Sequence, residues 1–311
     1  MDIFEFTDRP AKSLLFTRGD AFDTRLGEVV MTDAGDYARA STVILGCPQD
    51  EGVRRNRGRE GAREGPTEVR RALYKLTSFG IRDEELFDLG DLKIARTLEE
   101  THEHQHQVVT QVLRDRKKLI VIGGGNDISY PNCSALIDLF PDAVALNIDS
   151  HFDVREEKEA NSGTPYRQLL ENGLNPLRFF EIGYQRAVNS EIYLGYLEDL
   201  GVNCISLAEL RHDGVMKVIS DVVGHTDAPA AFWGFDLDVV RSSDAPGVSA
   251  PSPTGLTGEE FCELARLAGD RANTRIIEFT ELNPAFDIDS RTAKLVAFAI
   301  HEFLSASVPS R

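Results

Sequence analysis

Short apolar runs recur along the chain and alternate with longer segments of helical periodicity. The runs are rich in Val, Ile and Phe with little apolar–polar alternation, which is typical of strands buried on both faces of a parallel sheet. The strands predicted in this way are Val43–Cys47, Lys118–Ile122, Ala143–Ile148, Phe179–Gly183, Asn203–Leu207, Ala231–Phe235 and Thr274–Glu281, with Glu85–Leu89 as an additional candidate.

Helical segments lie between these strands, and some carry clear start signals. Pro66 suits the first turn of one helix, and Thr257 followed by Glu260 forms a capping box for another. Strands that alternate with helices predict a parallel sheet with helices on both faces. The predicted helices are Pro66–Leu76, Leu98–Arg116, Thr164–Asn172, Ala208–Val223, Gly258–Ala272 and Arg291–Ser305.

Polar residues with metal-ligand chemistry follow the apolar run Ala143–Ile148. Side chains alternate in an extended backbone, so Asp149, His151 and Asp153 are expected to point the same way at the strand's end. Two carboxylates and an imidazole that converge lose solvation, and the carboxylates repel each other unless a cation holds them. The spacing therefore predicts a metal site.

A second strand, Ala231–Phe235, ends in Asp236 and Asp238 with the same spacing. Such a pair alone is weak evidence, because aspartates at strand ends often serve as caps or turn residues. Mixed carboxylate and imidazole ligands suit Mn²⁺ or a similar divalent ion. Both motifs together predict a two-metal hydrolytic centre.

Composition excludes several classes of partner. The chain has 311 residues, long enough for one large α/β domain or two smaller ones, and its 41% hydrophobic and 27% charged content is ordinary for a globular protein. An excess of 51 Asp and Glu over 34 Lys and Arg gives a net charge of −17, which argues against nucleic acid or an anionic membrane as partner.

The cysteines and the apolar runs bear on location. Cys47, Cys133, Cys204 and Cys262 form no C-x-x-C pair and are expected to be free thiols. The amino terminus lacks a basic region followed by an apolar signal core, and no apolar run approaches the ~20 residues of a membrane span. A cytoplasmic protein is expected.

Other polar clusters also follow strands, where ligands collect in open α/β sheets. Gly123-Gly124-Gly125-Asn126-Asp127 follows one strand, and it is neither a P-loop nor a dinucleotide-binding turn. Glu281-Leu282-Asn283-Pro284 ends the last strand. The histidines at positions 102, 104 and 106 are spread around a predicted helix, so a solvated helix face is expected there rather than a metal tract.

In this combination and order, from about Val43 to Leu304, the chain resembles the arginase/agmatinase (ureohydrolase) superfamily, and within it most closely the formimidoylglutamases. The superfamily's signatures are a Gly-Gly-x-His strand end, D-x-H-x-D, D-x-D and a late Glu-x-Asn-Pro. The stretches that point to the subfamily are 50–59, Asn161-Ser162-Gly163-Thr164-Pro165, 245–251 and 283–287.

The resemblance implies a single ureohydrolase domain over residues 1–311, with a three-layer α/β/α sandwich, a mainly parallel central sheet and a Mn²⁺ pair. Asp149 and Asp236 would bridge the two ions, His151 and Asp238 would complete one site, and Asp153 the other. Asn126 stands where the family has a histidine ligand. An amide oxygen is a weaker donor than imidazole for Mn²⁺, so Asn126 is either a weak ligand or only a helix cap.

The implied reaction is hydrolysis of a linear amidine by water that the metals activate. Asp153 would orient the attacking group, a carboxylate such as Asp238 would shuttle a proton, and Glu281 would hold the cationic nitrogens of the substrate. N-Formimidoyl-L-glutamate carries two carboxylates, for which Arg54 or Arg57 is the candidate partner, with Asn161 and Ser162 as further substrate-binding candidates.

Three hypotheses remain open from the sequence. The first is formimidoylglutamate hydrolysis to glutamate and formamide in histidine breakdown. The second is hydrolysis of another guanidino or amidino compound, such as agmatine, arginine or a guanidino acid. The third is a non-catalytic family member that lost activity with the histidine. By the same resemblance, a trimer or hexamer is expected.

Overall fold

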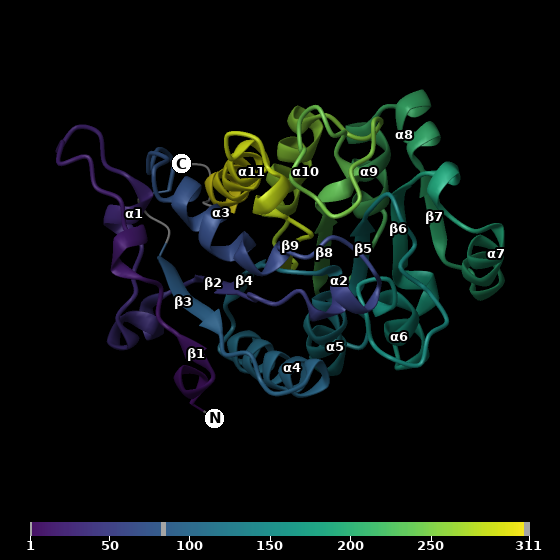
Figure 1. The fold of residues 1–311 in the computed structure, drawn as a ribbon, viewed down its shortest axis with the longest axis horizontal. Coiled ribbons are helices and arrows are strands. Elements are labelled where there is room, and N and C mark those ends of the chain that lie inside the picture. Colours follow the sequence, from purple (N-terminus) through teal and green to yellow (C-terminus); the bar gives the residue numbers. More distant parts are fainter. Residues whose placement is uncertain (1, 82–84, 308–311) are drawn as a thin grey trace.

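One nine-stranded sheet forms the centre of the molecule (Figure 1). The computed structural model describes residues 2–81 and 85–307, so residues 1, 82–84 and 308–311 of the expected 1–311 domain lie outside it. The strands are β1 (Thr7–Asp8), β2 (Thr42–Gly46), β3 (Leu86–Leu92), β4 (Lys118–Ile122), β5 (Val144–Ile148), β6 (Phe179–Tyr184), β7 (Asn203–Ser206), β8 (Ala231–Asp236) and β9 (Thr274–Thr280). All eight predicted strands are present.

Strands β2 to β9 are parallel, and the short β1 pairs antiparallel with β3 at the edge. Their order is β1-β3-β2-β4-β9-β8-β5-β6-β7. Strands β8 and β9, which come last in the chain, therefore lie between β4 and β5 in the middle of the sheet.

Helices cover both faces of the sheet, which confirms the predicted three-layer α/β/α sandwich (Figure 1). Alternate strand residues feed two separate cores. Ile120 and Ile122 of β4 join the core beneath α3, α10 and α11, whereas Leu119 and Val121 join the core beneath α4, α5 and α6. The helices are α1 (Leu26–Val29), α2 (Glu51–Arg55), α3 (Gly65–Leu73), α4 (Leu98–Arg114), α5 (Ser129–Leu139), α6 (Pro165–Glu171), α7 (Glu191–Leu200), α8 (Leu207–Asp213), α9 (Val215–Gly224), α10 (Gly258–Asp270) and α11 (Arg291–Ser307).

The structure corrects some of the predicted helices. The single helix expected over Ala208–Val223 is two, α8 and α9, because Gly214 adopts a φ of 92° and interrupts the hydrogen-bond ladder. The predicted helices do not include α5 and α7, nor the short α1 and α2. The predicted capping box of Thr257 and Glu260 is present at the start of α10.

The register of the central strands lines up the site. Ile148 of β5 pairs with Phe235 of β8, and Phe235 pairs with Phe279 of β9, which pairs with Ile122 of β4. This apolar row closes the core. Immediately beyond it, four neighbouring strands end together, so the polar residues that follow each strand meet at one edge of the sheet.

Candidate metal centre

Five residues from β5 and β8 converge beyond the apolar row. Ligand atoms of Asp149, His151 and Asp238 lie within 4.8 Å of one another, and those of Asp149, Asp153 and Asp236 form a second group of the same size. Asp149 belongs to both groups, whereas Asp236, the other bridging ligand that the resemblance implies, belongs to one. All five side chains come together as predicted, but not through strand alternation, because β5 ends at Ile148 and Asp238 lies in a 3-10 helix after β8.

Local hydrogen bonds fix the two motifs. The backbone N–H of His151 donates to Asp149 Oδ1 at 2.6 Å, and that of Asp238 donates to Asp236 Oδ1 at 3.0 Å. Ser150 Oγ donates to the carbonyl of Asp238 at 3.0 Å and so joins the two strand ends. The carboxylates of Asp149 and Asp236 are thereby oriented in the absence of a bound ion.

The carboxylates of this cluster destabilise one another's charge. Burial, with the nearby Asp238, raises the pKa of Asp149 to about 6. Burial also raises the pKa values of Asp153 and Asp236 well above the ordinary range, with further contributions from Asp149 and Asp238. Asp238 raises the pKa of His151 against an opposing effect of burial. Perturbation of this kind marks a functional site.

The donor set fits a pair of divalent cations. Among the described residues, the only cationic side chain paired with these carboxylates is His151, whose Nδ1 lies 3.0 Å from Asp238 Oδ2 and 3.6 Å from Asp149 Oδ1. Asp238 Oδ1 is buried and has no hydrogen-bond partner within residues 2–81 and 85–307. Carboxylates left without a counter-charge are costly, and a divalent cation relieves that cost.

Two residues of the site adopt left-handed backbone conformations. The φ angle is 48° at Asp153 and 67° at Glu281. Such conformations cost energy in residues other than glycine and cluster at active sites. The left-handed residue at Asp153 closes the D-x-H-x-D motif, and the one at Glu281 directly follows β9.

Asn126 lies inside the site. Its Nδ2 donates to Asp153 Oδ2 at 2.7 Å and to Asp149 Oδ2 at 3.3 Å, and its Oδ1 accepts from two hydroxyls. The helix-cap interpretation is wrong, because the capping positions of the adjacent turn and of α5 are Gly125 and Ile128.

Glu281 is held by the loops around it. Its Oε1 accepts from the backbone N–H of Asn126 at 2.9 Å, and its Oε2 accepts a short hydrogen bond from Ser249 Oγ. Burial raises the pKa of Glu281 to about 7. Sequence reasoning did not find Ser249, because a lone serine in a loop carries no signal of its own.

The arginines after β2 are not equivalent. Arg54 bonds Glu51 through two nitrogens, at 2.7 and 2.5 Å. Arg55 is held by Glu51, by Glu99 and by the Ala160 carbonyl, and Arg59 by the carbonyls of Val248 and Ser249. Arg57 is exposed, and within the described part of the chain its guanidinium has no hydrogen-bond or ion-pair partner.

The loop that carries Asn161 and Ser162 packs against α2. Asn161 is buried and uses its amide within its own loop, where it donates to Glu157 Oε2 at 2.8 Å and accepts from the Gly163 N–H at 2.9 Å. Ser162 Oγ accepts from Asn56 Nδ2 at 3.0 Å. These residues join the loop to the arginine-bearing segment.

The prediction of a solvated face for the histidines of α4 is wrong for His102. Its side chain is buried, and its Nε2 lies 2.7 Å from Asp127 Oδ2, which also accepts from Gln49 Nε2 at 2.6 Å. The stripe of buried positions in α4 runs through Leu98, Thr101, His102 and Gln105, so helical periodicity could have placed His102 inside.

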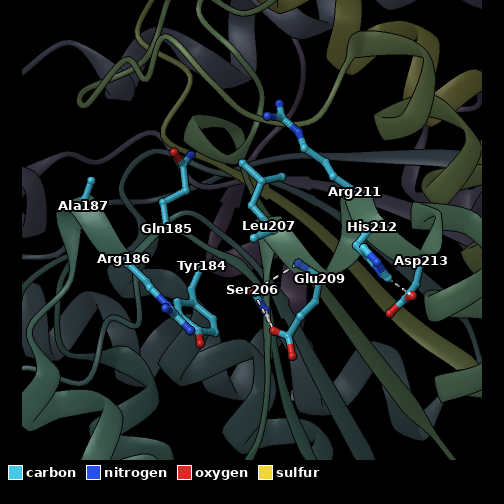
Figure 2. A pocket seen from close by; sticks show the side chains of 11 residues that line it. Tyr184, Gln185, Arg186, Ala187, Ser206, Leu207, Glu209, Arg211, His212 and Asp213 are labelled. Atoms are coloured by element: carbon cyan, nitrogen blue, oxygen red, sulfur yellow. Dashed lines mark hydrogen bonds and ion pairs between the residues drawn. The ribbon is translucent and has the colours of Figure 1, made fainter.

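A separate cleft of about 560 Å³ opens at the ends of β6 and β7 (Figure 2). Its polar side chains pair with near neighbours in the sequence. Ser206 caps α8 and exchanges hydrogen bonds with Glu209, and His212 Nδ1 lies 2.8 Å from Asp213 Oδ1. Gln185, in its wall, donates to Ser150 Oγ at 2.9 Å and so adjoins the metal-ligand loop. No group of metal ligands among the described residues lies in this cleft.

Fold and site together define a metal-dependent α/β hydrolase, and comparison with known proteins gives the family. Residues 40–305 match the Arginase family, and the chain belongs to it. A formimidoylglutamase of Staphylococcus carnosus is 35% identical over 279 residues, which cover 86% of each chain.

Two solved structures agree closely with the fold. A Trypanosoma cruzi formiminoglutamase, solved with Mn²⁺, superposes with a TM-score of 0.86 at 34% identity, over 91% of this chain and 98% of its own. The formimidoylglutamase of Bacillus subtilis superposes with a TM-score of 0.87 at 25% identity, over 94% of each chain. Among the described residues, no helix is long and apolar enough to cross a membrane.

Proposed function

We propose that this chain is a Mn²⁺-dependent hydrolase that converts N-formimidoyl-L-glutamate and water to L-glutamate and formamide. The observation that carries the proposal is the paired cluster of Asp149, His151, Asp153, Asp236 and Asp238, for which the described residues supply no cationic side chain other than His151. The relatives named formimidoylglutamase, one of them solved with Mn²⁺, support the metal and the substrate.

Each side chain has a defined part in this proposal. Asp149, His151, Asp236 and Asp238 would hold the ions, and Asp153 and Asn126 would serve the second one. Bound Mn²⁺ would supply a water of lowered pKa and a positive field at the amidine carbon. Asp153 would orient the attacking water, and Asp238 would accept its proton and deliver it to the departing amine.

Glu281 faces the cationic end of the substrate. Its pKa of about 7, raised chiefly by burial, falls once a cationic amidine lies beside it, since an opposite charge favours the carboxylate. Ser249 Oγ and the Asn126 N–H keep this carboxylate aimed into the site.

The carboxylates of the substrate require a cationic partner. Arg57 is a better candidate for this role than Arg54. Arg54 is already bonded to Glu51, and Arg57 has no described partner. The segment of Arg57 lies over the site: a Cβ at the adjacent Gly58 would lie 3.9 Å from that of Ser249. Asn161 and Ser162 stay substrate-binding candidates through the loop that they support.

A substrate panel tests the proposal. Purified protein loaded with Mn²⁺ is expected to release glutamate from formimidoylglutamate, and to turn over agmatine, arginine and guanidino acids at least tenfold more slowly in kcat/KM. Faster turnover of agmatine, which lacks a carboxylate, would overturn the assignment. Two bound ions with no turnover of any of these compounds would favour a non-catalytic protein.

Three further features are proposed on the sequence and the family resemblance: a single ureohydrolase domain, a cytoplasmic location and a trimeric or hexameric assembly. Free cysteines support a reducing compartment, and all four cysteines are free. Light scattering of the purified protein measures the oligomer, and a monomeric mass would refute the assembly.

A further inference from the structure

Asn126 faces a problem of orientation that imidazole does not have. Its Nδ2 lies toward Asp149 and Asp153, and its Oδ1 lies toward Ser129 Oγ and Thr280 Oγ1, at 2.9 Å from each. A cation held by those carboxylates accepts only the amide oxygen. Coordination by Asn126 therefore requires the amide to turn over, which exchanges the oxygen and nitrogen positions.

The turned amide needs two acceptors on its outer side. Its nitrogen carries two hydrogens, which then point at Ser129 Oγ and Thr280 Oγ1. Each hydroxyl has one proton and two lone pairs, so it accepts from the amide only if its own proton goes elsewhere. Ser129 and Thr280 are fully buried, and Asn126 is 2% exposed. Solvent therefore does not supply an acceptor for the amide hydrogens.

Each of the two hydroxyls has another acceptor to which it can donate its proton. Ser129 Oγ makes a short hydrogen bond to Glu278 Oε1, and Thr280 Oγ1 lies 3.4 Å from the Phe235 carbonyl. Glu278 is fixed in turn by Asn132, which is held by Gln105. The chain from Gln105 to Ser129 leaves the serine oxygen free to accept from the amide.

We propose that Ser129 and Thr280, with Glu278 behind Ser129, are positioning residues that let Asn126 present its oxygen to the second ion. They act through hydrogen bonds and do not touch substrate. The inference rests on the proposed metal centre and is independent of which amidine is hydrolysed. It also explains why an asparagine can stand at this position: two hydroxyls lie where the two amide hydrogens need them.

Calorimetric titration with Mn²⁺ tests the inference without any turnover. Ser129→Ala and Thr280→Val each leave one amide hydrogen without an acceptor. An unsatisfied buried donor is expected to lower the affinity for the second ion by about 5- to 50-fold. The first ion should bind as in the wild type, which also shows that each variant is folded. Thr274→Val is the matched control, because this buried β9 hydroxyl bonds Ala268 and Trp233 away from the site.

A histidine background separates positioning from a general structural effect. The outer nitrogen of an imidazole carries one hydrogen and needs one acceptor. In Asn126→His, at least one of the two hydroxyl substitutions is therefore expected to leave the second ion unaffected. Wild-type affinity in both single variants, or equal weakening in the asparagine and histidine backgrounds, would overturn the inference. If the Mn²⁺ titrations give the expected affinities but the protein does not hydrolyse formimidoylglutamate, only the substrate assignment is refuted.

Discussion

Removal of the Arg57 guanidinium should raise the KM for formimidoylglutamate and leave kcat nearly unchanged. A hydrogen bond to a charged group contributes ~1.5–3 kcal/mol, which corresponds to a rise in KM of about 10- to 150-fold. Arg57 adopts a φ of 61°, a left-handed conformation that alanine tolerates no better than arginine. Asparagine tolerates this conformation and is the better replacement.

Arg54→Gln is the control for this experiment. Arg54 is exposed and pairs with Glu51 on its own helix turn, so its loss should change KM by less than about twofold. Arg57→Lys keeps the charge without the planar fork, and should recover part of the lost affinity.

The assay follows glutamate release at several substrate concentrations, with agmatine as a second substrate. Because agmatine has no carboxylate, its KM should be the same for wild type and Arg57→Asn. A tenfold rise in the Arg54 variant with an unchanged Arg57 variant would refute the assignment. Equal losses on both substrates would instead indicate damage to the site itself.

Three other perturbations have defined outcomes. Asn126→His should lower the Mn²⁺ concentration for half-maximal activity, measured by titration after chelation, and no change would show that Asn126 is already a competent ligand. Burial raises the pKa of Glu278 to about 7 from 4.5; the folded state binds this proton more tightly, so the unfolding free energy should fall by up to about 3 kcal/mol as pH rises through this range. Denaturant unfolding of Glu278→Gln between pH 4.5 and 7 should show an unfolding free energy that depends less steeply on pH than in the wild type. An unchanged pH dependence would exclude Glu278 as the group responsible. Gly52→Ala places a Cβ 1.9 Å from Asp127 Oδ1 and should destabilise the protein by ~1–3 kcal/mol; an unchanged melting temperature would contradict this.

The metal-ligand residues after the strands were predictable from their types and spacing, but strand alternation does not aim them, because β5 ends at Ile148 and Asp153 has a left-handed φ of 48°. Which strands lie side by side was not predictable from spacing. The adjacency of β4 and β9 joins segments more than 100 residues apart in the sequence, and β8 lies next to β5 across more than 80 residues. Only the family resemblance anticipated that Asn126 and Glu281 belong to the same site.

The errors have local physical causes. Helix α5 is buried on most of its surface and therefore lacks the polar stripe that marks a helix in sequence. His102 was expected to face solvent because the three histidines at positions 102, 104 and 106 are spread around the helix, although its own position falls in the buried stripe of α4. Hydroxyls such as those of Ser129 and Ser249 gain their meaning only from partners distant in sequence, Glu278 and Glu281.

The place of β8 and β9 has a consequence for synthesis of the chain. A ribosome releases β4 and β5 first, yet these strands cannot pair with each other in the native sheet, since β8 and β9 lie between them. Until about residue 281 has emerged, β9 is missing and the sheet stays in two halves, so Asn126 after β4 cannot yet lie beside the carboxylates at the ends of β5 and β8. The sheet and the complete site are thus finished late and together, and pairing across such long separations is intrinsically slow. A ribosome-bound fragment that ends before β8 should expose apolar strand edges and depend on chaperones until the last third of the polypeptide arrives.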